Sequence, residues 1–364
     1  MELAITSLGM ISSVGYGVVA ACAAIRAGIV RPQPLHSFRV LVSQPVEDVP
    51  LTAYPIRDYT EGFALVGRWL RLASGAWADL LQYGSFPDRS HSDFWRRTGL
   101  VAAIPFPDEE SLSGRKEQDL ALLEEAYVQP LLKIANAPLR PEHTHLLWSG
   151  HTGALEALCH AQRMLESADV ERVIVLAADS YLDESLLEEL LAQRRLKTPA
   201  VPCGLMPGEA AACFLVEPEW KTRTRRARPE AVVRAVTAAR DERFSMAGPH
   251  TGTLLAQVVE RALDMAGLTS PFLGDVHTDL NGENWRASHM AHAQLRLSQR
   301  LSPAIRLRTA AHSLGEVGAA SGAVAVCVAC RSYQRGYALS DTSLILMSSE
   351  RGHCGAMLLE RPRS

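Results

Sequence analysis

Short apolar runs alternate with amphipathic segments along most of the chain. Continuous apolar runs at 173–178 and 210–216 predict strands that are buried on both faces. Further strands are predicted at 4–8, 145–148, 231–239, 272–277, 343–348 and 356–359. Helical periodicity predicts helices at 18–27, 120–134, 153–165, 186–191, 254–266, 285–300 and 317–333. This alternation favours mainly parallel sheets with helices on both faces.

Three segments add detail to this pattern. Residues 33–98 carry scattered prolines, tryptophans and tyrosines, and we predict irregular excursions from the core there. Pro130 is expected to kink or end the helix in which it lies. The segment 317–333 is apolar almost all round, so its helix is predicted to lie between two layers.

A basic segment divides the chain into two similar parts. Residues 221–229 read KTRTRRARP, a composition typical of an exposed linker, although its charge could also dock an acidic partner. Similar strand and helix patterns lie on either side of it. We therefore predict an N-terminal half at 1–220 and a C-terminal half at 230–364, which together form a duplicated α/β fold.

Composition narrows the class of protein. The 364 residues are 47% hydrophobic and 21% charged, as expected for a globular chain with a sizeable core. A net charge of −3 gives no general attraction to nucleic acid or to anionic membranes. The sequence contains no uncharged apolar run of about 18 residues, so no membrane span is predicted. No cofactor is predicted either.

The cysteines and the N-terminus indicate the compartment. The opening sequence MELAITSLGMISSVG lacks the basic region of a secretory signal. The seven cysteines are odd in number and mostly lie in apolar runs, which suits reduced thiols and a cytoplasmic location. Cys327 and Cys330 have redox or zinc spacing, but they lie in an apolar helical segment and are interpreted as core residues.

Glycine-containing motifs occur at residues 2–29, 202–217 and 312–326, and together they resemble those of β-ketoacyl-ACP synthases of the thiolase superfamily. Residues 2–29 are similar to the family's opening strand, glycine turn and helix. Residues 202–217, PCGLMPGEAAACFLVE, resemble its G-x-x-x-G-E-G-A strand, and residues 312–326, HSLGEVGAASGAVAV, its G-H-x-x-G-A-A-G-A stretch. The resemblance implies a thiolase fold, with two duplicated mixed-sheet halves in five α-β-α-β-α layers.

The elbow of this family departs from its usual pattern here. Condensing enzymes of the family place a nucleophilic cysteine at a strand-to-helix turn, where the helix N-terminus stabilises the thiolate. Aligning residues 145–165 with that elbow puts His151 at the cysteine position, and a shift of one residue would put Gly150 there. Neither residue supplies a thiol. Cys159 lies two turns further along and is expected to face the core.

Two further histidines match the other catalytic positions of the family. His277 and His312 are 35 residues apart, the spacing that the resemblance implies for its second and third catalytic residues. We expect His151, His277 and His312 to converge at the inner end of a tunnel, within about 4–6 Å of one another, so that at least one pKa is depressed.

Other family features are missing around these positions. TDLNGE follows His277 in place of GTGT, and Arg306 and Arg308 lie where a lysine is expected. SSERGHCGA at 348–356 replaces the G-F-G-G-T-N loop, which supplies an oxyanion amide in the family. These departures argue against acyl transfer more strongly than against the fold.

Several polar residues near the histidines are candidate pocket groups. Asp279, Asn281 and Glu283 could line the pocket, or could cap the helix that follows, and capping is the favoured interpretation. Ser149 and Thr152 flank the elbow, and a hydroxyl nucleophile activated by histidine is conceivable there. Three imidazoles could also hold zinc with an open fourth position, but ketosynthase relatives do not do so, and no metal site is predicted.

Two functional hypotheses remain open at this stage. In the first, His151 is a general base, and His277 and His312 stabilise an enolate, so that the chain is a malonyl-thioester decarboxylase or a cysteine-independent acyltransferase. In the second, which is favoured, the chain is a non-condensing pseudoenzyme. The resemblance includes cysteine-less second subunits of ketosynthase heterodimers and accessory proteins encoded with secretion-system effectors.

The second hypothesis predicts partners. The chain would form a homodimer, or a heterodimer with a ketosynthase-like chain, by antiparallel pairing of residues 172–178 across a two-fold axis. The apolar character of that segment would make an exposed edge prone to aggregation, and pairing would cover it. An acyl carrier protein, an acyl-CoA or an effector protein are the further candidate partners. No acyl adduct is expected on His151 or on any cysteine.

Overall fold

The computed structural model describes residues 2–43, 46–84, 86–88, 91–107, 116–167 and 169–363. Its strands are β1 (Leu3–Ser12), β2 (Gly15–Tyr16), β3 (Gln33–Ser43), β4 (Val46–Ala53), β5 (Thr98–Ile104), β6 (Thr144–Trp148), β7 (Arg172–Ser180), β8 (Glu209–Pro218), β9 (Ala231–Arg240), β10 (Asp275–Thr278), β11 (Arg306–Thr309), β12 (Thr342–Ser348) and β13 (His353–Glu360).

The α-helices are α1 (Val18–Arg26), α2 (Leu65–Tyr83), α3 (Ser92–Arg96), α4 (Lys116–Leu123), α5 (Gln129–Ala135), α6 (Gly153–Met164), α7 (Glu184–Ala192), α8 (Glu219–Arg225), α9 (Thr253–Met265), α10 (Asn284–Arg296), α11 (Ala311–Leu314) and α12 (Ser321–Gln334). The short helical segments are η2 (Glu124–Val128), η3 (Pro141–His143), η4 (Gly150–Thr152) and η5 (Gly318–Ala320).

The main sheet consists of two half-sheets with the same topology. The N-terminal half-sheet has the strand order β1-β8-β7-β5-β6, and the C-terminal half-sheet has the order β9-β13-β12-β10-β11. In each, the first three strands pair antiparallel and the last three pair parallel. The halves join where β1 pairs with β9 over Leu3–Ile5. This repeated order is the expected signature of a duplicated fold.

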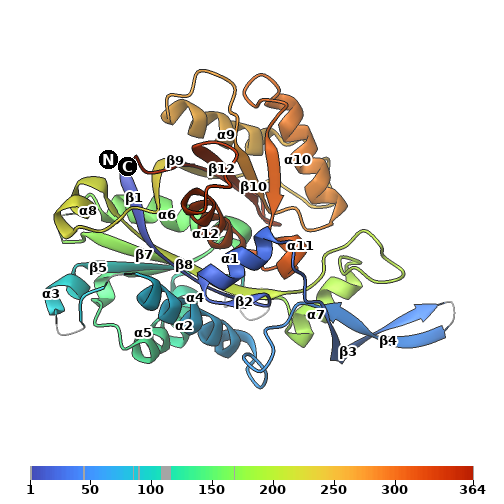
Figure 1. The fold of residues 1–364 in the computed structure, drawn as a ribbon. Helices are drawn as coiled ribbons and strands as arrows, with labels where there is room; N and C mark the ends of the chain where they lie inside the picture. Colours follow the sequence, from blue (N-terminus) through green and yellow to red (C-terminus); the bar gives the residue numbers. More distant parts are fainter. Residues whose placement is uncertain are drawn as a thin grey trace.

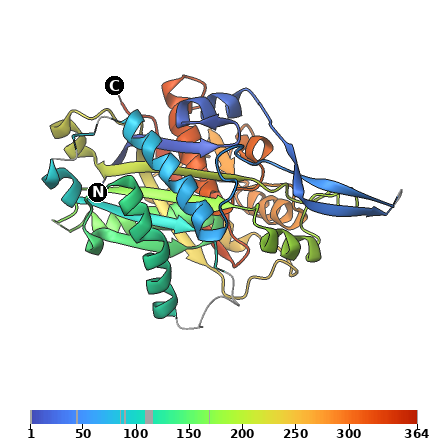
Figure 2. The ribbon, with the colours of Figure 1, turned by 90° about the horizontal axis from the view of Figure 1, so that it is seen from below.

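The helices form layers on both sides of these half-sheets (Figures 1 and 2). Helices α2 and α5 pack on the outer face of the N-terminal half-sheet, and α9 and α10 on the outer face of the C-terminal half-sheet. Helices α6 and α12 share one apolar cluster with residues from both half-sheets. The result is the predicted α-β-α-β-α arrangement.

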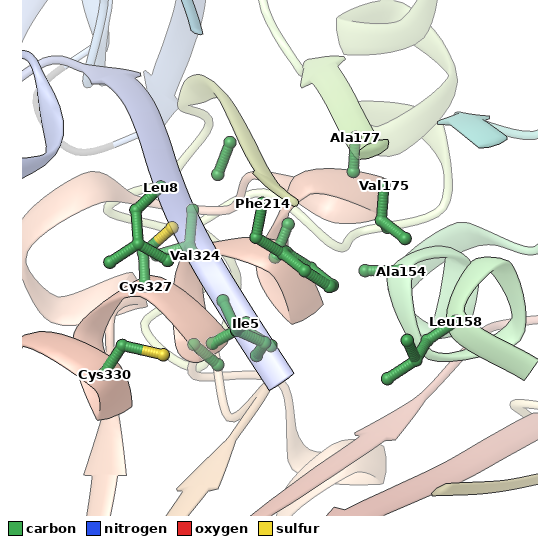
Figure 3. Packing of buried hydrophobic residues seen from close by; sticks show 14 of the residues in the cluster. Ile5, Leu8, Ala154, Leu158, Val175, Ala177, Phe214, Val324, Cys327 and Cys330 are labelled. Atoms are coloured by element: carbon green, nitrogen blue, oxygen red, sulfur yellow. The ribbon is translucent and has the colours of Figure 1, made fainter. Parts of the chain in front are cut away.

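The central layer forms the largest part of the core (Figure 3). Phe214 of β8 and Val175 of β7 are fully buried against this layer, as are Leu158 of α6 and Val324 of α12. Ten of the 14 residues of α12 are buried, so the prediction that this helix lies between two layers is confirmed. Cys327 and Cys330 are buried in the same cluster, in keeping with their interpretation as core residues.

The prediction that residues 172–178 form an exposed edge is wrong. Strand β7 pairs parallel with β5 on one side and antiparallel with β8 on the other, and every one of its residues is buried. Its apolar sequence therefore reflects a central strand. Within the described residues, the ends of the sheet are β6 and β11.

The prediction that residues 33–98 are irregular is also wrong. Strands β3 and β4 form an antiparallel hairpin that projects from the body (Figures 1 and 2). The 19-residue helix α2 then crosses the outer face of the N-terminal half-sheet, burying Trp69, Leu72 and Trp77. A Cβ at Gly9 of β1 would lie 2.2 Å from the Ala76 carbonyl oxygen, so this close packing requires a glycine.

Smaller differences concern the ends of elements. Pro130 does not end its helix, because the π-helical turn η2 precedes it and relieves the clash of its ring with the preceding turn. The predicted linker at 221–229 is helical up to Arg225. Strand β10 begins at Asp275, and α10 ends at Arg296. None of the helices in the described ranges has the length and apolar content needed to span a membrane.

Candidate functional site

The elbow lies between β6 and α6, where the chain turns through η4. Gly150 adopts φ 57°, and a Cβ there would lie 2.7 Å from the Phe106 ring. A Cβ on Gly153 would likewise lie 2.8 Å from that of Ala103 in β5, so the first turn of α6 sits close against the sheet. The turn between these two glycines places His151 in the interior, with no exposed surface.

The His151 side chain is held by two carboxylates from the C-terminal half. Its Nε2 lies 2.8 Å from Glu316 Oε1, and its Nδ1 lies 3.5 Å from Glu350 Oε2. Glu316 Oε1 also accepts a hydrogen bond of 2.7 Å from the backbone N–H of Gly318 in η5. The turn that precedes α12 thus orients the carboxylate that binds the elbow of the other half.

Arg286 of α10 completes the contacts of the imidazole. Its Nη2 lies 3.3 Å from Nδ1 and 3.2 Å from Nε2 of His151. Similar distances to both ring nitrogens place the guanidinium nitrogen over the ring face, because a position in the ring plane would overlap Cε1. Arg286 also binds Asp279 Oδ2 at 2.6 Å and Glu350 Oε1 at 3.0 Å.

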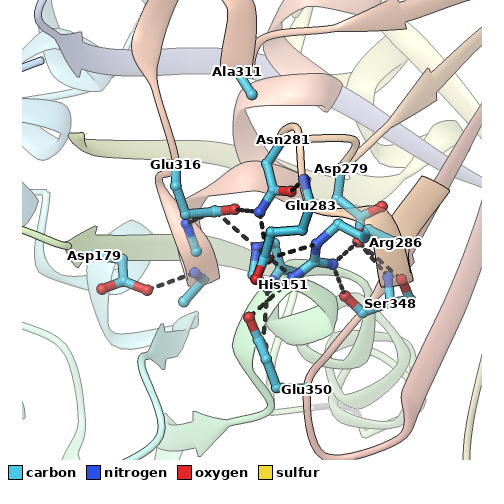
Figure 4. A network of polar contacts seen from close by, with 12 residues as sticks. His151, Asp179, Asp279, Asn281, Glu283, Arg286, Ala311, Glu316, Ser348 and Glu350 are labelled. Atoms are coloured by element: carbon cyan, nitrogen blue, oxygen red, sulfur yellow. Dashed lines mark hydrogen bonds and ion pairs between the residues drawn. The ribbon is translucent and has the colours of Figure 1, made fainter. Parts of the chain in front are cut away.

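A continuous polar network therefore surrounds the elbow (Figure 4). Arg195 extends it, since this side chain binds Glu283 at 2.6 Å and Glu350 at 3.1 Å. Asn281 donates hydrogen bonds to both Glu283 and Glu316. We call this set the elbow network: His151, Arg195, Asp279, Asn281, Glu283, Arg286, Glu316 and Glu350. Carboxylates oppose the cationic groups throughout it.

The electrostatics of the elbow network favour a protonated His151. Burial and Arg286 lower the pKa of this imidazole, but Glu316 and Glu350 outweigh them and raise it to about 10. The pKa of Glu316 falls to about 2, because its burial is outweighed by His151 and Arg286. An imidazolium with carboxylate partners has no free lone pair, and this arrangement argues against the predicted general base at the elbow.

The predicted pocket groups Asp279, Asn281 and Glu283 all belong to this network. Glu283 occupies the N-cap position of α10, but neither it nor Asp279 caps the helix through its side chain. Asp279 instead accepts a hydrogen bond of 2.7 Å from the Ser348 N–H in addition to binding Arg286. The capping interpretation is therefore wrong for Asp279 and Glu283, whose carboxylates form ion pairs, whereas Asn281 Oδ1 accepts a hydrogen bond of 3.0 Å from the Glu283 N–H at the start of α10.

Ser149 and Thr152 contact a carboxylate and not a histidine. Ser149 Oγ donates to Glu156 Oε2 at 2.6 Å, and Thr152 Oγ1 lies 3.0 Å from Glu156 Oε1. His353 Nδ1 lies 2.8 Å from that same Glu156 oxygen. A hydroxyl nucleophile requires a base that accepts its proton. Here the ionised Glu156 carboxylate, which His353 also contacts, takes the position expected for an activating histidine.

His277 has the opposite environment to His151. It is 5% exposed at β10, and its Nε2 has no hydrogen-bond partner in the described structure. Burial lowers the pKa of His277 to about 4; Asp275 opposes this shift, and Arg308 and Arg306 add smaller effects in the same direction as burial. The predicted depressed histidine pKa is therefore found, but desolvation causes it and not crowding with other imidazoles.

The structure places His312 apart from these groups. Its side chain is exposed on the short helix α11, and its backbone oxygen accepts a hydrogen bond of 3.4 Å from Tyr54. Within the described ranges, no hydrogen bond or ion pair joins any two of the three histidines. The same ranges contain no group of three or more His, Cys, Asp or Glu side chains placed to bind a metal ion.

The sequence analysis missed Glu316, Glu350, Arg195 and Arg286. Glu316 lies inside the family-like stretch HSLGEVGAASG, and Glu350 in the loop SSERGHCGA that departs from the family pattern. That departure signalled a lost oxyanion loop, but it also introduced a carboxylate. A buried imidazolium requires counter-charges, and these two glutamates were the available signal.

The comparisons with known proteins identify the fold. No protein-family model matches the sequence, and no curated protein does. Among solved structures, a complex of a type II polyketide synthase acyl carrier protein with its ketosynthase (AntDE and AntF) has a TM-score of 0.79 at 14% identity, covering 100% of this chain and 99% of that chain.

Two further structures show the same likeness. The ishigamide ketosynthase/chain length factor has a TM-score of 0.72 at 16% identity, with 100% of both chains covered. The ketosynthase from module 6 of the bacillaene synthase of Bacillus subtilis 168 has a TM-score of 0.77 at 9% identity, covering 100% of this chain and 73% of that one. The predicted ketosynthase-like thiolase fold is thus confirmed.

Proposed function

We propose that this chain is a ketosynthase-like pseudoenzyme that acts as a binding scaffold or as the partner subunit of a second ketosynthase-like chain. The ion-paired imidazolium of His151 at the elbow carries this proposal. An imidazolium can neither attack a thioester nor accept a proton. Removing its proton would leave the Glu316 and Glu350 carboxylates without the cation that both contact, which is costly in a buried site.

The two sheet edges suggest how a partner would bind. Strand β11 carries Arg306 and Arg308, which pair with Asp275, and charged side chains of this kind protect an edge from pairing. Strand β6 reads THLLW and contains no Asp, Glu, Lys or Arg. Its Leu147 and Trp148 are half-buried. We therefore propose that β6, in place of β7, pairs antiparallel across a dimer axis.

The cargo of such an assembly would be an acyl carrier protein, an acyl-CoA or an effector protein. One structural neighbour is described as an acyl carrier protein in complex with its ketosynthase, and another as a ketosynthase/chain length factor. These descriptions support a ketosynthase-like partner or an acyl carrier in preference to an effector.

Intact-mass spectrometry tests the absence of acyl transfer. After incubation with acyl-CoA or acyl-ACP we expect no adduct, because no thiol lies at the elbow. The exposed Cys203 serves as an internal standard, since iodoacetamide should alkylate it and prove that adducts are detected. A stable acyl adduct on any cysteine would refute the pseudoenzyme proposal. Decarboxylation of malonyl-CoA that is lost in His277→Ala would instead support an enzyme.

Light scattering with matched edge variants tests the proposed dimer. Leu147→Lys introduces a charge into β6, and Leu307→Lys does the same in β11, the equivalent strand of the other half. We expect the native chain to be dimeric, alone or with a ketosynthase-like chain, and only Leu147→Lys to dissociate it. Circular dichroism establishes that both variants are folded. Equal behaviour of the two variants would contradict pairing through β6.

A further inference from the structure

A cavity runs along α12, beside the elbow network. Ser321, Ala325, Val328 and Ser332 are spaced three or four residues apart, so they lie on one face of this helix. They line a cavity of about 80 Å³ that is closed by β10, β11 and the end of α1. Figure 1 shows α1 beside α12 at this place. The eleven residue-to-residue steps from Ser321 to Ser332 correspond to a length of about 16 Å.

The inner end of this cavity holds polar groups without partners. His277 Nε2 and Thr278 Oγ1 are both buried and make no hydrogen bond in the described structure. Buried polar atoms of this kind are costly unless something satisfies them. Both residues line the cavity. Because burial lowers the pKa of His277 to about 4, its imidazole is neutral at pH 7 and can exchange a hydrogen bond with an uncharged group.

The acidic residues that line the cavity already have cationic partners. Asp275 binds Arg306 at 2.5 Å and Arg308 at 3.3 Å. Asp279 binds Arg286, and Glu316 binds His151, as members of the elbow network. The inner end is unsuited to an anionic group, because Asp279 and Glu316 lie there and the cations that pair with them are already engaged.

The outer end of the cavity has the opposite character. Arg26 and Tyr337 line both the cavity and an adjoining surface groove of about 340 Å³, to which Arg331 and Arg335 also contribute. Arg26 stacks over the Tyr337 ring at 4.3 Å. In the described part of the chain, none of these three arginines forms an ion pair with a carboxylate. Arg331 donates to Tyr83 and Gln334, which are neutral.

We propose that this trough, formed by the cavity and its adjoining groove, binds a linear amphipathic anion. The carboxylate or phosphate head would lie among Arg26, Arg331 and Arg335, the apolar body along Ala325 and Val328, and a hydroxyl or carbonyl group at the far end against His277. Cavity and groove together fall within the range of ligand pockets, roughly 300–1,000 Å³. The inference does not depend on the proposed function.

Calorimetric titration with three probes of equal length tests this assignment. We expect 8-hydroxyoctanoate to bind more tightly than octanoate, which lacks the distal hydroxyl, and than 1,8-octanediol, which lacks the anion. Arg26→Gln should weaken binding of the hydroxy acid about tenfold, the equivalent of one charge-assisted hydrogen bond. It should leave diol binding unchanged. Octyl phosphate distinguishes a phosphate site from a carboxylate site by its relative affinity.

Two controls keep the test decisive. Arg223→Gln changes an arginine of α8 with an 82% exposed side chain and should not affect binding. Val328→Phe fills the trough from a half-buried position and should abolish binding of all probes. The ring nitrogens of His277 should shift in NMR spectra when the hydroxy acid binds. Equal affinity for acid and diol, or an Arg26→Gln variant that binds like the native chain, would overturn the proposal.

Discussion

His151 and His277 are both buried histidines that the sequence places at catalytic positions, but their surroundings differ. His151 lies between Glu316 and Glu350, and its pKa is raised to about 10. His277 lines a cavity and its Nε2 has no hydrogen-bond partner in the described structure, and burial lowers its pKa to about 4. Burial alone favours the neutral imidazole in both cases. The carboxylates reverse this preference at the elbow, so the same residue type is a fixed cation in one site and a neutral hydrogen-bonding group in the other.

The two histidines are connected through shared neighbours. Glu316 and Asp279 belong to the elbow network and also line the trough along α12. These two carboxylates therefore lie between the elbow, where the ionic groups have partners, and the cavity, where His277 and Thr278 have polar atoms without partners. Substitutions around His151 and around His277 test whether these different surroundings affect the free energy of unfolding as the structure indicates.

Glu316→Gln should have the largest effect. It removes the closest counter-charge of a buried imidazolium, and breaking a buried pair in this way costs about 3–5 kcal/mol. Urea denaturation at pH 7 measures the loss. Asp48→Asn is the control, because it removes an exposed partner of Arg39 and should cost less than about 1 kcal/mol. Similar losses for both variants would show that His151 is not held as a cation.

His277 should govern the acid side of the stability profile. Its folded pKa lies below that of the unfolded chain, so its contribution is present above about pH 6.5 and is lost as the pH falls through about 4. The expected loss between pH 7 and 4 is on the order of 2–3 kcal/mol. The profile of His277→Gln should be flatter over this range by that amount. An unchanged slope in the variant would show that His277 is solvated.

Glu350→Gln should have a smaller effect than Glu316→Gln. The Glu350 carboxylate lies 3.5 Å from His151 Nδ1 and its side chain is 14% exposed, so water can replace part of the lost interaction. It also binds Arg286 and Arg195, which would lose one partner each but keep Asp279 and Glu283. We expect a loss of about 1–2 kcal/mol in urea denaturation. A loss that exceeds that of Glu316→Gln would reverse the assigned order of the two carboxylates.

His312→Ala should have the smallest effect. Its side chain is exposed and carries no contact of the elbow network. Substitution at such a position should change the free energy of unfolding by no more than about 0.5 kcal/mol. Thermal denaturation at pH 7 provides the measurement. A strongly destabilised variant would mean that His312 contacts the interior, as the sequence-based prediction of three converging histidines required.

The sequence predicted the fold well because the residue patterns that specify strands and turns are local. Apolar runs such as 173–178 and the glycine-rich turns at 150–153 and 315–318 specify buried strands and tight turns wherever they occur. The position of a strand within a sheet depends on partners far away in the chain. Strand β7 was therefore recognised as a strand but was wrongly placed at an edge.

The candidate site was less predictable for the same reason. The spacing of His277 and His312 predicted that their side chains would converge. The orientation of α11 instead exposes the His312 side chain. The partners of His151 are 165 and 199 residues away in the sequence, at Glu316 and Glu350. Charge complementarity over such distances becomes visible only once the two halves are folded together.

NMR titration of the His151 ring tests the central claim most directly. With ring-¹⁵N-labelled histidine, assigned by comparison with His151→Gln, both ring nitrogens should show the shifts of an imidazolium from pH 6 to beyond pH 9. A folded pKa above that of the unfolded chain also means that its stabilising contribution is full below about pH 6.5 and is lost as the pH rises toward 10. Titration of His151 at or below pH 7 would show a neutral imidazole at the elbow and would contradict the proposed non-catalytic role of this site.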